Sequence, residues 1–465
     1  MTRKLPGLDL PPLRSVVEGI AWPGIPENSA AHLLAACFQL DRSQWWTPEA
    51  IQAQQLCQLR ALLSHAVETV PHYQGRDYRR WLRDSDRDAW TSFRELPVLT
   101  RRAAQQAGDA LRAVQLPAYH GQVAEGQTSG STGAPLRYWT TPLAQAFWNA
   151  IVMRDHFWHR RDFSALHAFI RASPDTEVTP TWGPPSSALF AVGESAVMSS
   201  QRTTAELLKW LVDLNPDYLR AQPITIRSLA RLALDGGLRL SRLKEVRTVA
   251  ETVTDSLRKL VHEAWGARII DIYSSSECGM LALQCPVSGD YHSQSEVAIV
   301  EVIDSNGMAC EPEEIGRVIV TPLHNFAMPL IRYDTGDFAE VGSACRCGRG
   351  LPTLKRILGR RRNRLHLPDG NTTWPQLSSM PWHQLAPEIE RFQLRQEKDF
   401  SLRFLYEAGA PLPVDSLTLI DTALTNQLRC SLPIRFERLD MFPVTEAGKL
   451  EDFVSSIDDE HEVAS

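Results

Sequence analysis

The stretch Thr128-Ser129-Gly130-Ser131-Thr132-Gly133-Ala134-Pro135, followed by the β-like run LRYWT, decides the fold. Its two glycines let backbone amides approach an anion closely, and its hydroxyl groups can donate hydrogen bonds to phosphate oxygens. The alternative is a flexible Ser/Gly linker, but such linkers rarely end at a proline directly before a strand. A nucleotide-kinase loop would need Lys after the last glycine, where Ala134 stands. We therefore predict a polyphosphate-binding loop.

The composition sets the class of protein. A chain of 465 residues is too long for one compact core, and its 43% hydrophobic and 22% charged residues are typical of soluble globular proteins. The net charge of -6 gives no reason to expect a nucleic-acid or anionic-membrane partner. The N-terminus lacks the apolar region of a signal peptide, and no stretch approaches the ~20 apolar residues that span a bilayer. We expect a cytoplasmic protein with small-molecule or protein partners, and we leave a homodimer open.

Hydrophobic periodicity predicts how the chain is organised. Residues 47–70 form an expected helix with Thr47 as N-cap and Pro48 in its first turn. From about residue 120, short β-rich runs alternate with helical ones, which indicates an α/β fold with a parallel sheet, and residues 297–341 favour a strand-dominated subdomain. We expect a large N-terminal domain (1–360) with mixed sheets and a β-rich subdomain, and a small α+β C-terminal domain (361–465), with a hinge at Arg361-Arg362.

Five motifs together resemble those of the acyl-adenylate-forming superfamily, which includes acyl-CoA ligases and peptide-synthetase adenylation domains. TSGSTGAP is similar to its ATP-phosphate loop, and the others follow in the family's order: Tyr273-Ser274-Ser275-Ser276-Glu277, Arg332-Tyr333-Asp334-Thr335-Gly336-Asp337, Gly359-Arg360 and Gly448-Lys449. The stretches LLSHAVETVPHY and ELPVLTRRA resemble the phenylacetate-CoA ligase branch. The chain departs from the family pattern at three positions, which are Ser274, Ser276 and Asn363.

The resemblance implies a role for each motif in the adenylation of a carboxylic acid by ATP. In the phosphate loop, Thr128, Ser129, Gly130, Ser131, Thr132 and Gly133 would hold ATP. Glu277 would ligate Mg²⁺, Ser276 would touch the α-phosphate, and Tyr273 would lie near the adenine. Taken alone, Glu277 is better explained as a solvent-facing acid after a strand.

Four further residues complete this site. By resemblance, Glu251 would border the adenine, and Lys449 would bridge the acyl carboxylate and the α-phosphate. An ionised carboxylate can accept two hydrogen bonds at once, so Asp337 suits the ribose hydroxyls, and Arg360 would reach the ribose or a phosphate. Outside the motifs, Asp337 would be a common turn residue and Lys449 an ordinary solvated lysine.

Four N/S side chains suggest a metal site. Cys345-Arg346-Cys347 places two thiols on one tight turn, and Cys285 and His292 could complete the tetrahedral set that structural Zn²⁺ prefers. Some members of the resembled branch carry a metal at a matching arrangement. The alternatives are cysteines that bind no metal, or Cys278 in place of His292 or Cys285. With four protein ligands, the role would be structural.

The sequence thus predicts an ATP-dependent, AMP-forming acid-thiol ligase. The resemblance implies an aromatic or heteroaromatic acid, with CoA or the phosphopantetheine of a separate carrier protein as acceptor. Two rival functions are transfer of the acyl group to an amine, giving an amide or an N–N bond, and a non-catalytic zinc-bearing scaffold. The basic run KRILGRRRNR (355–364) could instead indicate a nucleic-acid patch, but we favour phosphate contact and a hinge, because no basic stripe extends it.

Overall fold

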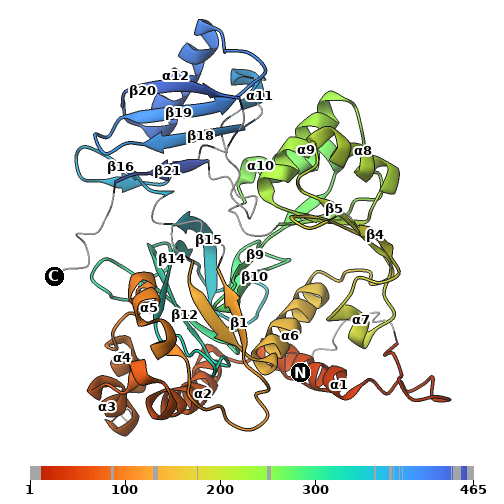
Figure 1. Ribbon diagram of the computed structural model, residues 1–465, viewed down its shortest axis with the longest axis vertical. Helices are drawn as coiled ribbons and strands as arrows, with labels where there is room; N and C mark the ends of the chain where they lie inside the picture. The colour runs from red at the N-terminus through yellow and green to blue at the C-terminus, as the bar shows by residue number, and fades with distance from the viewer. Residues whose placement is uncertain are drawn as a thin grey trace. The chain divides into compact units, whose positions relative to one another are not determined.

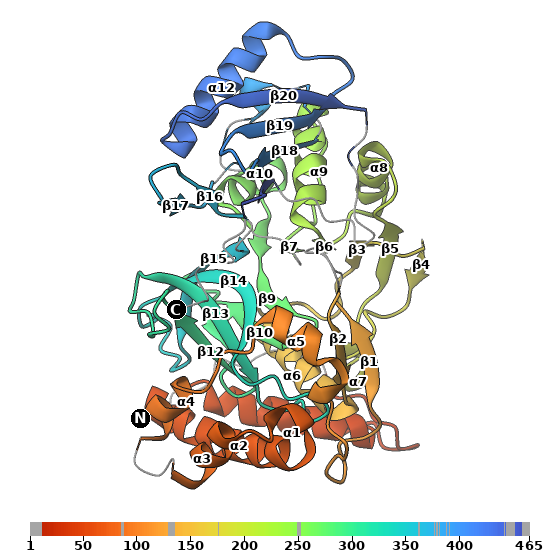
Figure 2. The same ribbon diagram turned by 60° about the vertical axis from the view of Figure 1, so that its left-hand side comes forward.

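The computed structural model describes residues 12–84, 88–128, 135–174, 176–248, 253–360 and 363–457, except 376, 378–379, 381, 387, 390, 441 and 443–451 (Figures 1 and 2). The chain forms two compact units. The first comprises residues 1–167, 178–195 and 272–357, and the second comprises 168–177, 196–271 and 358–465. The division at residue 360 stays a prediction.

The first unit begins with helices. They are α1 (Asn28–Ser43), α2 (Pro48–Thr69), α3 (Arg76–Asp84), α4 (Ala89–Arg94) and α5 (Arg101–Ala107), with 3₁₀ turns at Pro71–Tyr73 and Gly108–Leu111. The helix predicted over 47–70 is confirmed as α2, where the Thr47 side chain accepts a hydrogen bond from the Ala50 amide and Pro48 occupies the first turn. Leu59, Leu62 and Leu63 are fully buried, so this helix anchors the core of the unit.

A seven-stranded sheet forms the β-rich part of the same unit. Its strand order is β12-β13-β14-β15-β11-β10-β9. The strands are β9 (Ile272–Ser275), β10 (Gly279–Gln284), β11 (Tyr291–Ser293), β12 (Ala298–Ile303), β13 (Ile315–Pro322), β14 (Tyr333–Val341) and β15 (Thr353–Arg360). The strand-dominated subdomain predicted over 297–341 is confirmed. Two further helices of this unit are α6 (Pro142–Trp158) and α7 (Ser186–Leu189), and the hairpin β1 (Ala124–Gln127) and β2 (Arg137–Thr140) precedes them.

A six-stranded sheet of order β4-β5-β3-β6-β7-β8 provides the α/β part of the fold. Its strands are β3 (His167–Arg171), β4 (Thr176–Thr179), β5 (Ser195–Ser199), β6 (Tyr218–Ala221), β7 (Glu245–Thr248) and β8 (Arg268–Ile270). The pairs β6–β7 and β7–β8 are parallel, as expected from the alternation of strands and helices. The helices α8 (Thr204–Leu214), α9 (Pro223–Asp235) and α10 (Asp255–Trp265) share one hydrophobic core with it.

The C-terminal part has its own core and four-stranded sheet of order β20-β19-β18-β21. Its elements are β16 (Leu365–His366), β17 (Thr372–Thr373), α11 (Trp382–Leu385), β18 (Arg391–Gln396), β19 (Leu402–Glu407), α12 (Val414–Leu428), β20 (Ile434–Leu439) and β21 (Phe453–Ser455). The predicted α/β fold with a small α+β C-terminal part is thus confirmed.

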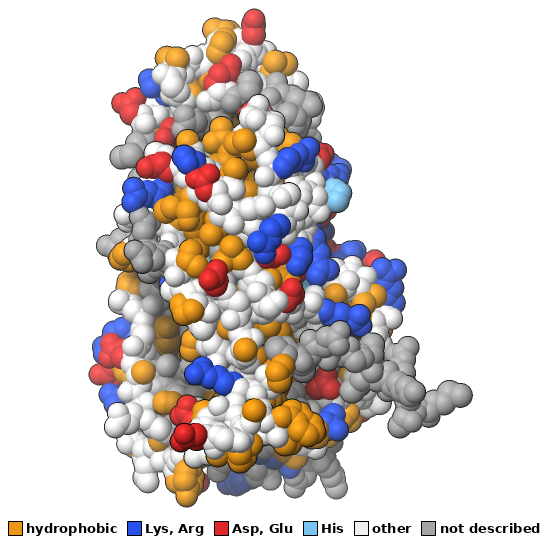
Figure 3. All heavy atoms as spheres, turned by 90° about the vertical axis from the view of Figure 1, so that its right-hand side faces the viewer, with side chains coloured by type: hydrophobic (Ala, Val, Ile, Leu, Met, Phe, Trp, Pro, Cys, Tyr) orange, Lys and Arg blue, Asp and Glu red, His pale blue; other side chains and the backbone are white. Residues whose placement is uncertain are grey.

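The described surface agrees with the composition. On the face shown in Figure 3, basic and acidic side chains are interspersed rather than gathered into fields of one sign. Within the described part of the chain, no helix combines the length and the apolar character that a bilayer crossing requires.

Candidate active site

Ser276 and Glu277 lie on the tight connection between β9 and β10. The Cys278 amide donates to Ser275 Oγ at 3.0 Å. Gly279 has a φ of +94°, a backbone conformation that residues with a side chain rarely adopt. The connection therefore turns sharply at the end of a strand pair. This places the predicted α-phosphate contact and the predicted Mg²⁺ ligand next to each other at one edge of the sheet.

The Glu277 carboxylate is held by two side chains. The Tyr333 hydroxyl donates to Glu277 Oε1 at 3.3 Å, and Arg101 Nη1 lies 3.7 Å from the same oxygen. Arg101 Nη2 also donates to Thr128 Oγ1 at 2.8 Å. Arg101 therefore connects the predicted Mg²⁺ ligand to the first residue of the phosphate loop. Sequence reasoning did not assign Arg101 a role, although it lies in the stretch ELPVLTRRA that supported the resemblance.

Thr128 closes the base of the phosphate loop. Its amide donates to Leu136 O at 3.0 Å, and the Leu136 amide donates to Thr128 Oγ1 at 2.9 Å. The two ends of the loop are thereby fixed side by side between the end of β1 and the start of β2. Ser129, Gly130, Ser131, Thr132 and Gly133 lie outside the described residues, and their roles stay predictions.

Tyr273 and Asp337 meet directly. The Tyr273 hydroxyl donates to Asp337 Oδ2 at 2.8 Å, and the Asp337 amide donates to Thr335 Oγ1 at 3.1 Å. Burial, and then the Asp337 charge, raise the pKa of Tyr273 well above its usual range, so the phenol stays protonated and keeps donating. Gly336 has a φ of +77° at the turn between Thr335 and Asp337. The predicted adenine and ribose contacts thus form one hydrogen-bonded unit.

Arg332 belongs to the same motif as Asp337 but has a structural role. This buried residue has a φ of +49°. Its guanidinium donates to Glu301 Oε2 at 3.2 Å and to the backbone carbonyls of Arg94 and Leu96. It therefore ties β14 to the end of α4, which makes it a structural anchor.

A cavity of about 400 Å³ opens beside Glu277, within the first unit. Its aromatic wall includes Tyr138, Phe147 and Trp148, the last two from α6. Ser276, Glu277, Cys278, Gly279 and Met280 also line it. Burial, followed by the Glu277 charge, raises the pKa of Tyr138. Trp182 is not in this lining and instead packs on Phe163, His156 and His167.

Arg360 ends β15, and its amide donates to Asn363 Oδ1 at 2.9 Å. Asn363 Nδ2 in turn donates to Phe453 O at 2.7 Å. This pairing uses both polar atoms of the Asn363 amide, whereas a carboxylate could accept from Arg360 but could not donate to a carbonyl. The predicted ribose or phosphate contact of Arg360 stays a prediction. Glu251, Lys449 and the hinge residues Arg361 and Arg362 lie outside the described residues.

The basic run is partly neutralised by an acid. Lys355 Nζ lies 3.0 Å from Glu340 Oε1, and Arg356 pairs with Glu340 Oε2. These two cations therefore belong to the local structure of β14 and β15.

The four predicted metal ligands come together. Cys285, His292, Cys345 and Cys347 each bring one ligand atom into a group whose members all lie within 4.8 Å of one another. Cys285 Sγ is 3.8 Å from Cys345 Sγ, and Cys347 Sγ is 3.3 Å from His292 Nε2. His292 Nδ1 lies 3.0 Å from Leu351 O, a contact that leaves Nε2 as the ligand nitrogen. Cys278 is not in the group, so the alternative ligand set that used it is excluded.

The surroundings of the thiols favour negative charge on sulfur. The amides of Val287, Cys347 and Arg349 each donate to a ligand sulfur at 3.4 Å. Burial raises the pKa of Cys285, but the His292 ring and backbone amides outweigh it and bring the pKa to about 5. Burial, with Cys345 and Cys285 adding to it, raises the pKa of Cys347 to about 11. Cys285 thus forms a thiolate easily, whereas a thiolate on Cys347 needs a cation to share its charge.

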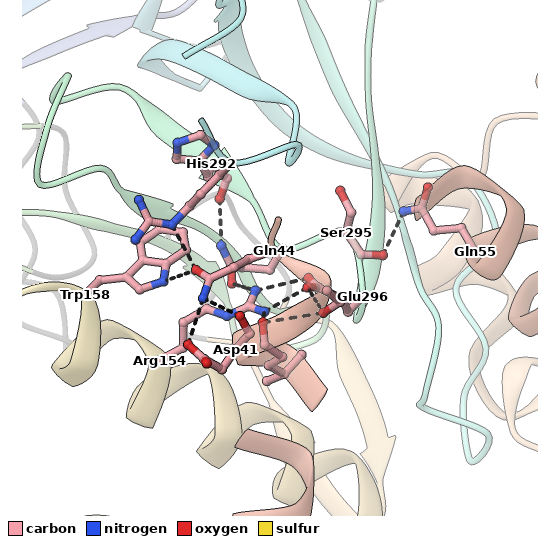
Figure 4. Close-up of polar contacts among 12 residues, drawn as sticks. Asp41, Gln44, Gln55, Arg154, Trp158, His292, Ser295 and Glu296 are labelled. Carbon is pink, nitrogen blue, oxygen red and sulfur yellow. Dashed lines mark hydrogen bonds and ion pairs between the residues drawn. The ribbon is translucent and has the colours of Figure 1, made fainter. Parts of the chain in front are cut away.

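A polar network connects this Cys/His group to α6 and to the end of α1, and Figure 4 shows its part around Gln44, Arg154 and Glu296. Gln44 Oε1 accepts from Trp158 Nε1 at 2.7 Å and from Arg349 Nε at 2.9 Å. Arg154 forms two bonds to Glu296, of 2.7 and 3.0 Å. Burial alone would raise the pKa of Glu296, but the Arg154 charge outweighs it and lowers the pKa. One end of α6 is therefore fixed beside the Cys/His group, while residues near its other end line the cavity.

The sequence relatives of this chain agree with the family that its motifs resemble. No protein-family profile matches the chain. A phenylacetate-coenzyme A ligase of Thermus thermophilus is 30% identical over 177 residues, which is 37% of this chain and 40% of that protein. The enzyme of the same name from Escherichia coli is 25% identical over 425 residues, covering 85% of this chain and 89% of the relative.

Solved structures share the fold. A 2-hydroxyisobutyryl-CoA ligase in the postadenylation state aligns with a TM-score of 0.67 at 17% identity, covering 91% of this chain and 92% of that one. An anthranilate CoA ligase in complex with anthranoyl-AMP aligns with a TM-score of 0.52 at 16% identity, over 73% of this chain and 68% of that one.

The chain therefore has the fold of these CoA ligases, and its five ordered motifs resemble those of the acyl-adenylate-forming superfamily. Within that class, the sequence matches bear out the resemblance to the phenylacetate-CoA ligase branch.

Proposed function

We propose that this chain is an AMP-forming ligase that activates an aromatic or heteroaromatic acid with ATP and then passes the acyl group to a thiol. The observation that carries this proposal is the position of the Ser276–Glu277 motif at one cavity. Ser276 and Glu277 line the cavity beside aromatic side chains, and Arg101 connects Glu277 to the base of the phosphate loop.

In the first step, an oxygen of the acid's carboxylate attacks the α-phosphorus of ATP. The bond from that phosphorus to the bridging oxygen breaks, and the pyrophosphate leaves with its electron pair. Charge thus grows on the leaving group, and fixed cationic groups and hydrogen-bond donors lower the barrier. Mg²⁺ supplies charge neutralisation when it is bound, with Glu277 as the expected ligand. We assign Ser276 to the α-phosphate and the Tyr273–Asp337 pair to the nucleoside.

In the second step, a thiol sulfur attacks the acyl carbonyl carbon and gives up its proton to solvent, the bond from that carbon to the phosphate oxygen breaks, and AMP leaves with the electron pair. CoA is the acceptor we favour, because the relatives in sequence are named as coenzyme A ligases. A separate carrier protein with a phosphopantetheine thiol would undergo the same chemistry. Comparing CoA with a loaded carrier protein as acceptor, at saturating acid and ATP, distinguishes the two.

We also propose that Cys285, His292, Cys345 and Cys347 hold a structural Zn²⁺. With Zn–S bonds of about 2.3 Å, two sulfurs of a tetrahedral site lie about 3.8 Å apart. The Cys285–Cys345 separation of 3.8 Å fits this geometry, and the amide donors fit thiolate ligands. Four protein ligands leave no open position, so the metal would stabilise the loop after β10 and take no part in the reaction.

The test is acid-dependent exchange of labelled pyrophosphate into ATP across aryl and aliphatic acids, with Mg²⁺. We expect exchange with an aryl acid. Lys449→Ala should lower the exchange rate on the order of 10²- to 10³-fold, because a charged transition-state contact is lost. The matched control is Lys398→Ala, an exposed lysine of the same C-terminal part. Absence of exchange with every acid by folded, metal-loaded protein would favour the non-catalytic scaffold.

A further inference from the structure

The strand β2 directs alternate side chains to the cavity and to the core. Tyr138 and Thr140 line the cavity, whereas Trp139 between them is buried in the hydrophobic core of the first unit. Tyr138 is only partly buried, so a ligand in the cavity can reach its side chain. The Tyr138 phenol is therefore an accessible polar group of the cavity, and no motif assigns it a role.

The residue opposite Tyr138 makes room for its ring. Gly126 of β1 pairs with Tyr138 across the hairpin. A Cβ on Gly126 would meet the tip of the Tyr138 ring, with the hydroxyl oxygen 2.6 Å away. The ring therefore occupies space that the side chain of any other residue at position 126 would fill.

The Tyr138 hydroxyl lies at the polar end of the cavity, beside Ser276 and Glu277. Burial and then the Glu277 charge raise the pKa of Tyr138, and a hydrogen bond with Ser276 partly offsets this rise. The phenol therefore stays protonated at neutral pH. Because a serine hydroxyl can donate to the phenol oxygen, the phenol hydrogen can be donated to a ligand.

The lining offers no fixed positive charge to an acid. Among the described residues that line the cavity there is no Lys or Arg, and Glu277 is the one acidic side chain. His324, which stacks on Phe147 in the same lining, is neutral near pH 7, because burial and then the His120 ring lower its pKa to about 4. Within this lining, a carboxylate that lies next to Ser276 can therefore be stabilised only by neutral donors.

We propose that the Tyr138 hydroxyl binds the carboxylate of the acid substrate beside the α-phosphate of ATP. This inference rests on the proposed function and adds a substrate-binding residue to it. Ser276, the expected α-phosphate contact, is the neighbour of the Tyr138 hydroxyl, so a carboxylate held by Tyr138 lies next to the phosphorus that it attacks. A carboxylate has two oxygens, so one can accept from Tyr138 while the other attacks and meets the expected Lys449 contact.

The test is Tyr138→Phe in the pyrophosphate exchange assay, with an acid that the wild type adenylates. This variant removes one hydroxyl and keeps the ring over Gly126. The KM for the acid should rise about 10- to 100-fold, because a hydrogen bond to a charged group is lost. The KM for ATP should stay within about twofold, and the rate at saturating acid within about threefold, because the lost contact binds the acid equally in the ground state and the transition state.

A second variant and a control accompany this one. Gly126→Ala keeps the hydroxyl but displaces the tip of the ring, so the KM for the acid should also rise, by about tenfold, while the KM for ATP stays unchanged. Tyr119→Phe is the control, because it removes the hydroxyl of a fully exposed tyrosine, and it should leave both KM values unchanged.

The outcomes separate this inference from the proposed function. If Tyr138→Phe leaves the KM for the acid within about twofold of the wild-type value, the inference is wrong while adenylation stands. Should this variant fail to fold, an unchanged KM for the acid in Gly126→Ala has the same meaning. If the KM values for acid and ATP rise together, Tyr138 supports the site as a whole, and the inference is also wrong. If no acid supports exchange with the wild type, the proposed function itself fails, and this inference fails with it.

Discussion

The two ends of β10 place two cysteines seven residues apart in opposite environments. At the start of the strand, burial and the neighbouring Glu277 charge raise the pKa of the Cys278 thiol well above its usual range. Just beyond its end, the Cys285 pKa is about 5, because His292 and backbone amides outweigh the effect of burial. The thiols are chemically the same, and both are buried. The hydrogen-bond donors and charges around each sulfur decide which one becomes a thiolate.

This contrast separates two kinds of site on one element. At the cavity end, Ser276 and Glu277 have expected roles in the reaction, and Cys278, which follows them, has no expected role in it. At the metal end, Cys285 belongs to a ligand group, and the network through Gln44 and Arg349 fixes the surrounding structure. Substitutions at the cavity end should therefore change rates, and substitutions at the metal end should change stability.

Glu277→Gln should lower the exchange rate as strongly as Lys449→Ala. Loss of the carboxylate removes the expected Mg²⁺ ligand and the partner of Arg101 and Tyr333, so pyrophosphate exchange should fall about 10²- to 10³-fold. The thermal midpoint should change little, because Gln has the same shape. Exchange assays and a circular-dichroism melt of the same preparation measure both quantities. Exchange that equals the wild type would exclude Glu277 from the site.

Cys285→Ser should lower the stability of the protein and leave the adenylation rate nearly unchanged. Loss of one ligand should release the metal and lower the free energy of unfolding by at least about 3 kcal/mol. The protein that remains folded should adenylate within a few-fold of the wild-type rate. Metal content by atomic emission and a denaturant titration test this, with Cys57→Ser as the control, an exposed thiol outside the ligand group. A full complement of zinc in the Cys285 variant would contradict the ligand assignment.

Physical causes decide which site residues at each end of β10 the sequence predicts. The clustering of the Cys/His group was predictable because thiol and imidazole groups have few other reasons to gather, and all four predicted residues meet. Tyr273, Glu277 and Asp337 were placed through the order of their motifs, and their hydrogen bonds now show how the motifs join. Arg101 and His324 could not be assigned in this way, since their positions depend on long-range packing of segments with no recognisable motif of their own.

The cavity end should respond to acid through His324. Its pKa in the folded state, about 4, is below the ordinary value near 6.5, so between these values the unfolded chain binds more protons. The stability that its neutral ring contributes is present above pH 6.5 and is lost as the pH falls towards 4, by up to about 2 kcal/mol at pH 5. His324→Phe should show a shallower loss over this range in denaturant titrations. Parallel curves for the two proteins would show that His324 does not titrate with folding.

Arg101→Lys should have a smaller effect on the rate. The guanidinium bonds Thr128 through one nitrogen and approaches Glu277 and Tyr333 through the other, whereas an ammonium group is a single point charge. We expect exchange to fall about tenfold. The control is Arg102→Lys, the exposed neighbour on the same helix. If the two variants behave alike, the connection between the phosphate loop and Glu277 has no role in catalysis.

The smallest effect is expected from modifying the cavity thiol. Because burial and the Glu277 charge hold the pKa of Cys278 high, its thiolate is scarce at neutral pH, and iodoacetamide reacts with the thiolate. Metal-loaded enzyme treated at pH 7 should keep its exchange rate to within about twofold, and Cys278→Ala should behave in the same way. Rapid inactivation of the wild type that Cys278→Ala prevents would show that this thiol ionises readily. Both thiols at the ends of β10 could then become thiolates. The two ends would differ in that Cys285 belongs to the Cys/His group and Cys278 does not.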